Sequence, residues 1–150
     1  MKFGAYKIII KDKLVIEYYS GTINTDDLIC LKDALRKEPD YSFYHNSIID
    51  VRDCILDIDS SEYKELIDYT KKNIKETGIR KVAYLTSKPK DVVMSSLYPN
   101  LANENNLGFV SGVFSTEKSV VSWFGKEIIT ESHLTDIINE LKTMPNILCK

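Results

Sequence analysis

Several residues whose side chains could do chemistry stand close together between positions 50 and 62. The acids are Asp50, Asp53, Asp57 and Asp59, and they are followed by Ser60, Ser61 and Glu62. Carboxylate oxygens are good ligands for hard cations such as Ca²⁺. The spacing does not fit an EF-hand loop, which requires a glycine at its sixth position and a distal glutamate. Solvated loop acids explain the four aspartates better than a metal site does.

The serines stand where a helix is expected to begin. The helix is predicted from Asp59 to Thr77, with Gly78 as its stop. Its apolar face is formed by Tyr63, Leu66, Ile67, Thr70 and Ile74. Asp59 and Glu62 have the spacing of a capping box, in which each side chain accepts a hydrogen bond from a backbone amide of the first turn. A helix N-terminus also attracts anions, so the same segment could bind one without being modified.

The elements that position this segment alternate between strand and helix. Strands are predicted at Tyr6–Ile10, Leu14–Tyr19, Ser47–Val51, Lys81–Thr86 and Gly108–Phe114. Further helices are predicted from an N-cap at Thr25 to just before Pro39, from about Pro89 with a break near Pro99, from Ser115 to Gly125, and from Ser132 to Met144. The first two strands form a hairpin, and the later ones alternate with helices. This order predicts an α/β fold with a mostly parallel mixed sheet of about five strands.

The chain is predicted to be one domain over residues 1–150, with a core at about 5–125 and a C-terminal helical extension at about 126–150. Ile48–Ile49 and Val82–Leu85 are apolar on both sides of the pleat, as expected for strands covered on both faces. Strands paired in sequence order would place the linking helices on one face. We therefore expect the C-terminal helix or a second subunit to cover the other.

Charge and cysteine content narrow the class of protein. The net charge is −2, which gives no general attraction to nucleic acid or to an anionic membrane. No apolar run is long enough to span a bilayer. The three cysteines, Cys30, Cys54 and Cys149, are odd in number and lack a C-x-x-C pair, which argues against a disulfide framework and against zinc. We expect free thiols and a cytoplasmic location.

No catalytic constellation is evident. The two histidines, His45 and His133, are expected at the surface or near a helix start, and no G-x-S-x-G elbow accompanies any serine. The glycines form neither a P-loop nor a G-x-G-x-x-G turn. We therefore predict a protein that is not an enzyme and has no cofactor.

Three segments resemble the SpoIIAA-like superfamily, which includes the STAS domains. They are Gly21–Leu28, Ser47–Asp53, and Phe114–Phe124 with Trp123, and the resemblance covers roughly residues 5–125. Anti-sigma factor antagonists of this superfamily carry an Asp-Ser-Ser-Gly type motif at the corresponding helix start. The resemblance implies that Ser61 matches their phosphorylated serine. Glu62 stands where those proteins have glycine, and its negative charge disfavours a second anion.

The resemblance implies a bacterial, non-enzymatic regulatory or protein-binding module. Its partner, or a second copy in a homodimer, would dock on the loop formed by Asp57, Asp59, Ser60, Ser61 and Glu62. The alternative is a carrier or sensor of a small apolar, lipid-like ligand, by analogy with CRAL-TRIO-like relatives. A docking module should expose an apolar patch beside the loop. A carrier should contain a closed pocket of about 300–1,000 Å³, and an enzyme a cleft with converging polar groups.

Overall fold

The computed structural model describes residues 1–73, 79–88 and 108–149, and these residues form a five-stranded sheet in the order β1-β2-β3-β4-β5. The strands are β1 (Phe3–Ile9), β2 (Leu14–Ile23), β3 (Asn46–Leu56), β4 (Arg80–Leu85) and β5 (Phe109–Phe114). A single 3-10 turn, η1 (Ile10–Asp12), joins β1 to β2, which is antiparallel to it. All other neighbouring pairs are parallel, so the predicted fold class is confirmed.

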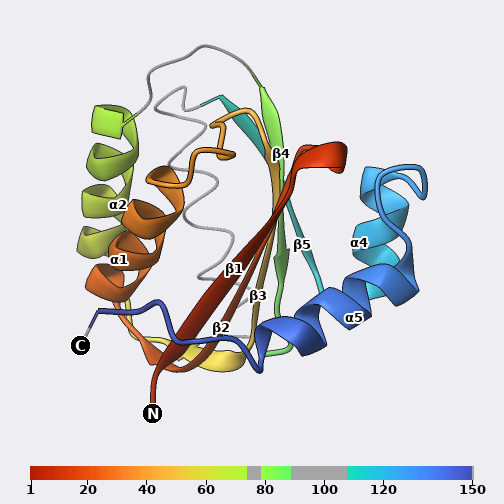
Figure 1. Ribbon diagram of the computed structural model, residues 1–150. Coiled ribbons are helices and arrows are strands. Elements are labelled where there is room, and N and C mark those ends of the chain that lie inside the picture. The colour runs from red at the N-terminus through yellow and green to blue at the C-terminus, as the bar shows by residue number, and fades with distance from the viewer. Residues whose placement is uncertain (74–78, 89–107, 150) are drawn as a thin grey trace.

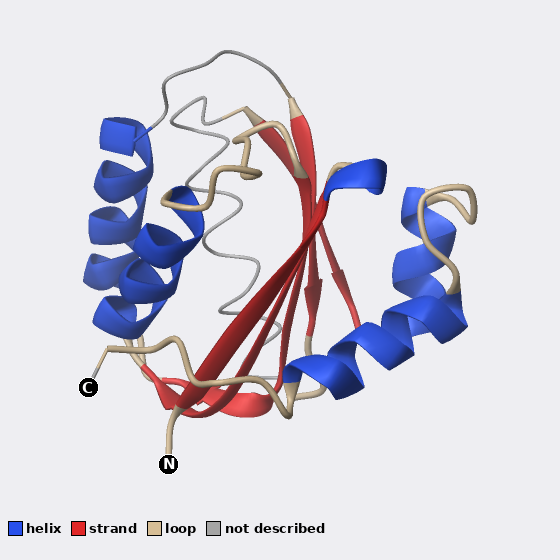
Figure 2. Cartoon of the chain, in the orientation of Figure 1, coloured by secondary structure: helices blue, strands red, loops and turns tan. Residues whose placement is uncertain are grey.

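Helices cover both faces of the sheet (Figure 1). The helices α1 (Thr25–Arg36) and α2 (Ser60–Asn73) lie side by side on one face. The helices α4 (Glu117–Phe124) and α5 (Glu131–Leu141) lie on the other (Figure 2). The expectation that the C-terminal helix covers the second face is therefore confirmed, with α4 sharing that role.

Each face has its own apolar core. Side chains of β2 alternate between the two, so that Ile16 and Tyr18 point to α4 and α5, while Tyr19 and Ile23 point to α1 and α2. The apolar face of α5 is buried in the first core through Leu134, Ile137, Ile138 and Leu141. The α5 helix is therefore an integral layer of the domain, since its removal would expose one face of the sheet.

Several boundaries differ from the sequence-based expectation; β2, for example, continues to Ile23 instead of ending at Tyr19. Asn24, and not Thr25, is the N-cap of α1, because its side chain accepts from the Asp27 amide while the Asp27 carboxylate accepts from the Asn24 amide. The strand β3 continues through the expected polar loop as far as Leu56, since its extra residues pair with the far end of β2. The predicted ends of α2 at Thr77 and Gly78, and the helix expected from Pro89, lie outside the described residues.

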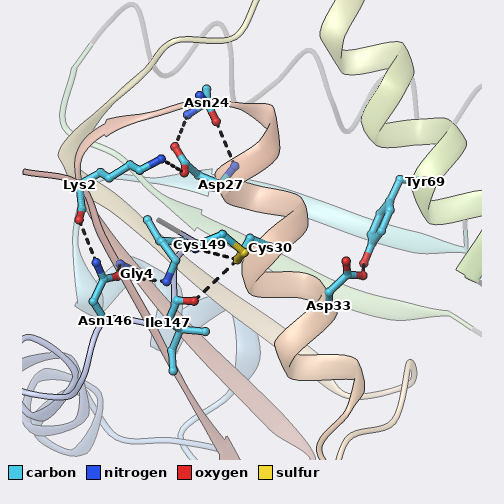
Figure 3. The surroundings of a disulfide bond; sticks show 11 residues. Lys2, Gly4, Asn24, Asp27, Cys30, Asp33, Tyr69, Asn146, Ile147 and Cys149 are labelled. Carbon is cyan, nitrogen blue, oxygen red and sulfur yellow. Dashed lines mark hydrogen bonds and ion pairs between the residues drawn. A yellow bond between two sulfur atoms is a disulfide. The ribbon is translucent and has the colours of Figure 1, made fainter.

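The segment after α5 returns across β1 to the first helix (Figure 3). The Gly4 amide donates to the Asn146 side chain at 3.0 Å, and the Ile147 amide donates to the Gly4 carbonyl at 2.8 Å. Leu148 is buried in the core beside Leu31. A Cβ at position 4 would lie 2.7 Å from Leu148 Cδ2, so a larger residue there would force the Leu148 side chain to shift.

This return brings Cys149 to Cys30, and the two form a disulfide with a Cα–Cα distance of 5.9 Å. The expectation of free thiols is therefore wrong for these two cysteines and holds for Cys54, whose buried thiol forms no disulfide. The two partners are 119 residues apart, so local spacing carries no sign of their pairing. The two cysteines come close because Leu148 packs into the core. Their proximity therefore exists only in the folded chain.

Candidate functional site

The loop from Asp57 to Glu62 is built as a helix cap. Asp59 Oδ1 accepts hydrogen bonds from the amides of Ser61 and Glu62, at 2.9 and 3.0 Å, and Glu62 Oε2 accepts from the Asp59 amide at 2.8 Å. These reciprocal bonds are the predicted capping box. Hydrogen bonds from Ser61 and from the amides hold the pKa of Asp59 below its usual value. Capping is therefore confirmed for Asp59 and Glu62.

Ser61 and Ser60 are exposed, as a docking or modification segment requires. The Ser61 hydroxyl donates to Asp59 Oδ1 at 2.6 Å, so it is already engaged by a carboxylate. A phosphate on that oxygen would be repelled by Asp59 as well as by Glu62. Glu62 also accepts from the Thr25 hydroxyl at 3.3 Å, which ties the first turns of α1 and α2 together. Asp57 is exposed, and its amide donates to the Ile23 carbonyl at 2.8 Å.

The four aspartates do not come together as a cluster of solvated acids. Asp50 is fully buried and makes a two-point ion pair with Arg52, which also bonds Glu117 of α4 at 2.8 Å. Asp53 is exposed and accepts from the Tyr18 hydroxyl at 2.7 Å. That hydrogen bond, aided by Lys142, lowers the pKa of Asp53. Because β3 is extended here, the acids point in different directions, and the described residues contain no cluster able to hold a metal.

The histidines also lie apart. His45, expected at the surface, is buried ahead of β3, where its Nδ1 faces the Ser42 amide and its ring meets the edge of Tyr41. Burial, with the nearby Lys13, lowers the pKa of His45. His133 is exposed in the first turn of α5, as predicted. Neither ring has a nucleophile and an orienting carboxylate beside it among the described residues.

A pocket lies between the α1–α2 layer and the sheet. It encloses a cavity of about 110 Å³. The sheet contributes Glu17, Tyr19, Ile49, Val51, Leu56, Arg80, Val82 and Tyr84, and Ile58 follows β3. The helices and the segment before β3 contribute Leu28, Lys32, Arg36, Tyr41, Tyr63, Leu66, Tyr69 and Thr70. The polar centre of the pocket was not predicted, and the sequence signal for it was Glu17, an acid in the middle of an otherwise apolar strand pattern.

Glu17 is the polar centre of this pocket. Its side chain has no exposed surface, and it accepts from the Lys32 ammonium and from the Tyr19 hydroxyl, the latter at 2.9 Å. A buried carboxylate is tolerated only when it is paired in this way. Burial lowers the pKa of Lys32, and the Glu17 carboxylate partly offsets that effect. Burial also raises the pKa of Tyr19, and Glu17 adds to that rise.

Two arginines complete the polar side of the pocket. Arg36 donates to the Asn73 carbonyl at 3.2 Å and lies 5.3 Å from the centre of the Tyr69 ring. Arg80 stacks over Phe43 at 4.6 Å and reaches the Ser47 hydroxyl at 3.4 Å. Aromatic faces thus hold both guanidinium groups, an arrangement that arginine favours over lysine.

The cap and the pocket share a wall. Ile58 precedes Asp59, Tyr63 follows Glu62, and both side chains are buried and line the cavity. A change in how the pocket is filled would therefore act directly on the two residues that flank the cap.

Comparison with known proteins supports the fold and does not identify a function. No protein-family profile and no curated protein matches the sequence. A crystal structure of an uncharacterized protein of the DUF3478 family from Shewanella loihica PV-4, which has a SpoIIAA-like fold, is similar at a TM-score of 0.52 and 14% identity. The match covers 82% of this chain and 94% of that one. No helix within the described residues could cross a membrane. The chain has a SpoIIAA-like, STAS-type α/β fold.

Proposed function

We propose that this protein is a non-enzymatic binding module of STAS-like type that holds a small ligand between the α1–α2 layer and the sheet. The observation that supports this proposal is the pocket, whose apolar walls surround the buried ion pair of Glu17 and Lys32. Ligand sites commonly combine apolar walls with a few fixed polar groups. The cavity of about 110 Å³ is smaller than a lipid carrier needs, so the occupant is a small molecule.

The polar groups of the pocket favour binding over catalysis. The Glu17 carboxylate already accepts from Lys32 and Tyr19, so it is poorly placed to act as a free general base. The pair fixes the shape of the pocket floor, because breaking it would leave a charge buried. A rigid polar floor gives selectivity for one orientation of a ligand.

The Asp57–Glu62 loop gives this proposal its second part, docking of a partner protein. Ile55 stands just before the loop and is 52% exposed although it is large and apolar. Asp57 and Ser60 beside it are exposed and polar. A small apolar contact with a polar rim is a common arrangement at interfaces. Ile58 and Tyr63 line the pocket and flank this loop. The loop would therefore take one conformation when the pocket is filled and another when it is empty.

Native mass spectrometry of the protein purified from its own cells tests both parts. We expect the wild type to retain a small molecule and the Leu66→Trp variant, which fills the pocket, to lose it. Val110→Trp is the matched control, because Val110 is exposed on β5 away from the pocket. Ile55→Ser should retain the small molecule and lose any co-purifying protein. A wild type that carries no small molecule, and whose pocket amides do not shift with a fragment library in NMR spectra, would contradict ligand binding.

The cytoplasmic location remains part of the proposal. The disulfide of Cys30 and Cys149 opposes it, since disulfides are uncommon in reducing compartments. Alkylation of thiols in intact cells tests this location. If the protein is cytoplasmic, Cys30 and Cys149 should be reduced and both should be labelled.

A further inference from the structure

Residues 145–149 form a C-terminal strap that crosses β1, an edge strand of the described sheet, and is itself neither helix nor strand. The amide and the carbonyl of Gly4 are both bonded to the strap, through Asn146 and Ile147 (Figure 3). Asn146 Nδ2 also donates to the Lys2 carbonyl at 3.1 Å. The strap therefore occupies a stretch of sheet edge of the kind on which another strand can pair.

The strap has few non-covalent contacts of its own. Leu148 is buried in the core beside Leu31, whereas Pro145, Asn146 and Cys149 are exposed. Fixing the backbone of a segment costs conformational entropy at every residue. For a segment of this length that cost is comparable with the gain from one buried leucine and a few hydrogen bonds. The non-covalent contacts alone therefore leave the strap near a balance between docked and free.

The helix α1, which carries the other half of the disulfide, is held in place independently of it. Lys32 pairs with the buried Glu17 of β2, and Asp33 accepts a hydrogen bond from the Tyr69 hydroxyl of α2. Leu35 is buried under the helix. Loss of the disulfide should therefore free the strap and leave α1 on the sheet.

The disulfide is open to a reductant at one of its sulfur atoms. Cys149 is exposed, while Cys30 is half-buried in α1. A thiolate of a dithiol reductant would attack Cys149 Sγ, form a mixed disulfide and expel the Cys30 sulfur as a thiolate, which takes up a proton. The Cys149 amide donates to Cys30 Sγ at 2.8 Å, which favours negative charge on the leaving sulfur. The second thiol of the reductant then releases Cys149 as a thiol, and the reductant becomes a cyclic disulfide.

We propose that the disulfide of Cys30 and Cys149 is a redox latch, which holds the C-terminal strap on the edge of β1 when oxidised and releases it when reduced by a dithiol. Release uncovers Leu31 together with the backbone N–H and C=O groups of Gly4. The sheet and α1 keep the same arrangement in both states. The device is independent of the proposed pocket ligand.

NMR relaxation of the ¹⁵N-labelled full chain, before and after addition of dithiothreitol, tests the latch. On reduction, the order parameters of the Ile147 and Leu148 amides should fall from about 0.85, the value of rigid backbone, to below about 0.6. The amides of Leu31 and Ile48 should stay near about 0.85, because α1 and the sheet remain docked. These values describe motion within the folded state, so a change in the free energy of unfolding does not alter them. Reoxidation should restore the rigid strap.

Two variants serve as controls. Cys30→Ser/Cys149→Ser should show a mobile strap with and without dithiothreitol. Cys54→Ala keeps the disulfide and should respond to dithiothreitol as the wild type does.

A strap that stays rigid in the reduced, folded protein would overturn the proposal, because the disulfide would then be a structural bridge only. Loss of order throughout α1, or unfolding of the whole chain on reduction, would overturn it as well, since a latch requires the rest of the fold to persist.

Discussion

The Glu17 carboxylate lies wholly inside the protein and is neutralised by Lys32, whose side chain is 26% exposed. One partner of this ion pair is therefore locked in the interior, while the other is within reach of solvent. The two residues should respond differently to substitution.

Lys32→Met should destabilise the fold by about 3 kcal/mol or more, because it leaves a buried carboxylate with the Tyr19 hydroxyl alone. Glu17→Gln should cost only about 1–2 kcal/mol, since the freed ammonium can turn toward water. Urea denaturation of both variants measures the difference. Lys7→Met removes an exposed pair with Glu140 and should change the free energy of unfolding by at most about 1 kcal/mol. Equal costs for the two pocket variants would contradict the asymmetry.

His45 should make the protein less stable as the pH falls below 6.5. The pKa of His45 in the folded state lies below the ordinary 6.5. At a pH between these two values, the unfolded chain therefore binds a proton at this residue and the folded chain does not. The free energy of unfolding therefore decreases as pH falls from about 6.5 toward the folded-state pKa. His45→Gln should remove this slope in denaturation curves, and His133→Gln, at an exposed site, should retain it. An unchanged slope in His45→Gln would mean that another group is responsible.

Asp59→Ala should loosen the first turn of α2. The variant frees the amides of Ser61 and Glu62, which Asp59 now binds. Hydrogen exchange should become faster at these two amides, and Asp57→Ala should leave them unchanged. Because the pKa of Asp59 is lowered from 3.8, the same protection is present above that pH and is lost as pH falls through the folded-state pKa. Equal exchange rates in both variants would rule out the cap.

The Cys30 and Cys149 disulfide should stabilise the protein by about 4–5 kcal/mol, from the loop-closure entropy of the unfolded chain. The double variant Cys30→Ser/Cys149→Ser should unfold at correspondingly lower urea concentration. Wild type treated with dithiothreitol should match the variant, which serves as the control for the substitutions. Identical curves for oxidised and reduced wild type would contradict a stabilising bridge.

The sequence predicted the alternation of strands and helices because periodic apolar residues mark local structure. It also predicted the box of Asp59 and Glu62, whose partners lie within one turn. It missed what depends on distant packing. Asp53 and the residues after it as far as Leu56 read as a loop, and only pairing with the end of β2 makes them strand. The Glu17–Lys32 pair and the disulfide join segments whose proximity appears only when α1 lies on the sheet.

The position of the disulfide also sets how the protein bears mechanical load. Force applied between Met1 and Cys149 would travel through the first strands to Cys30 and then cross the bridge directly. Only the residues before Cys30 could extend, by about 100 Å at full stretch. The strands β3, β4 and β5 lie outside the loaded path, and so does α2, which forms part of the pocket wall. While the bridge is intact, tension would unravel β1, β2 and the start of α1 and leave the remaining chain unloaded; once it is reduced, the same pull would reach every element.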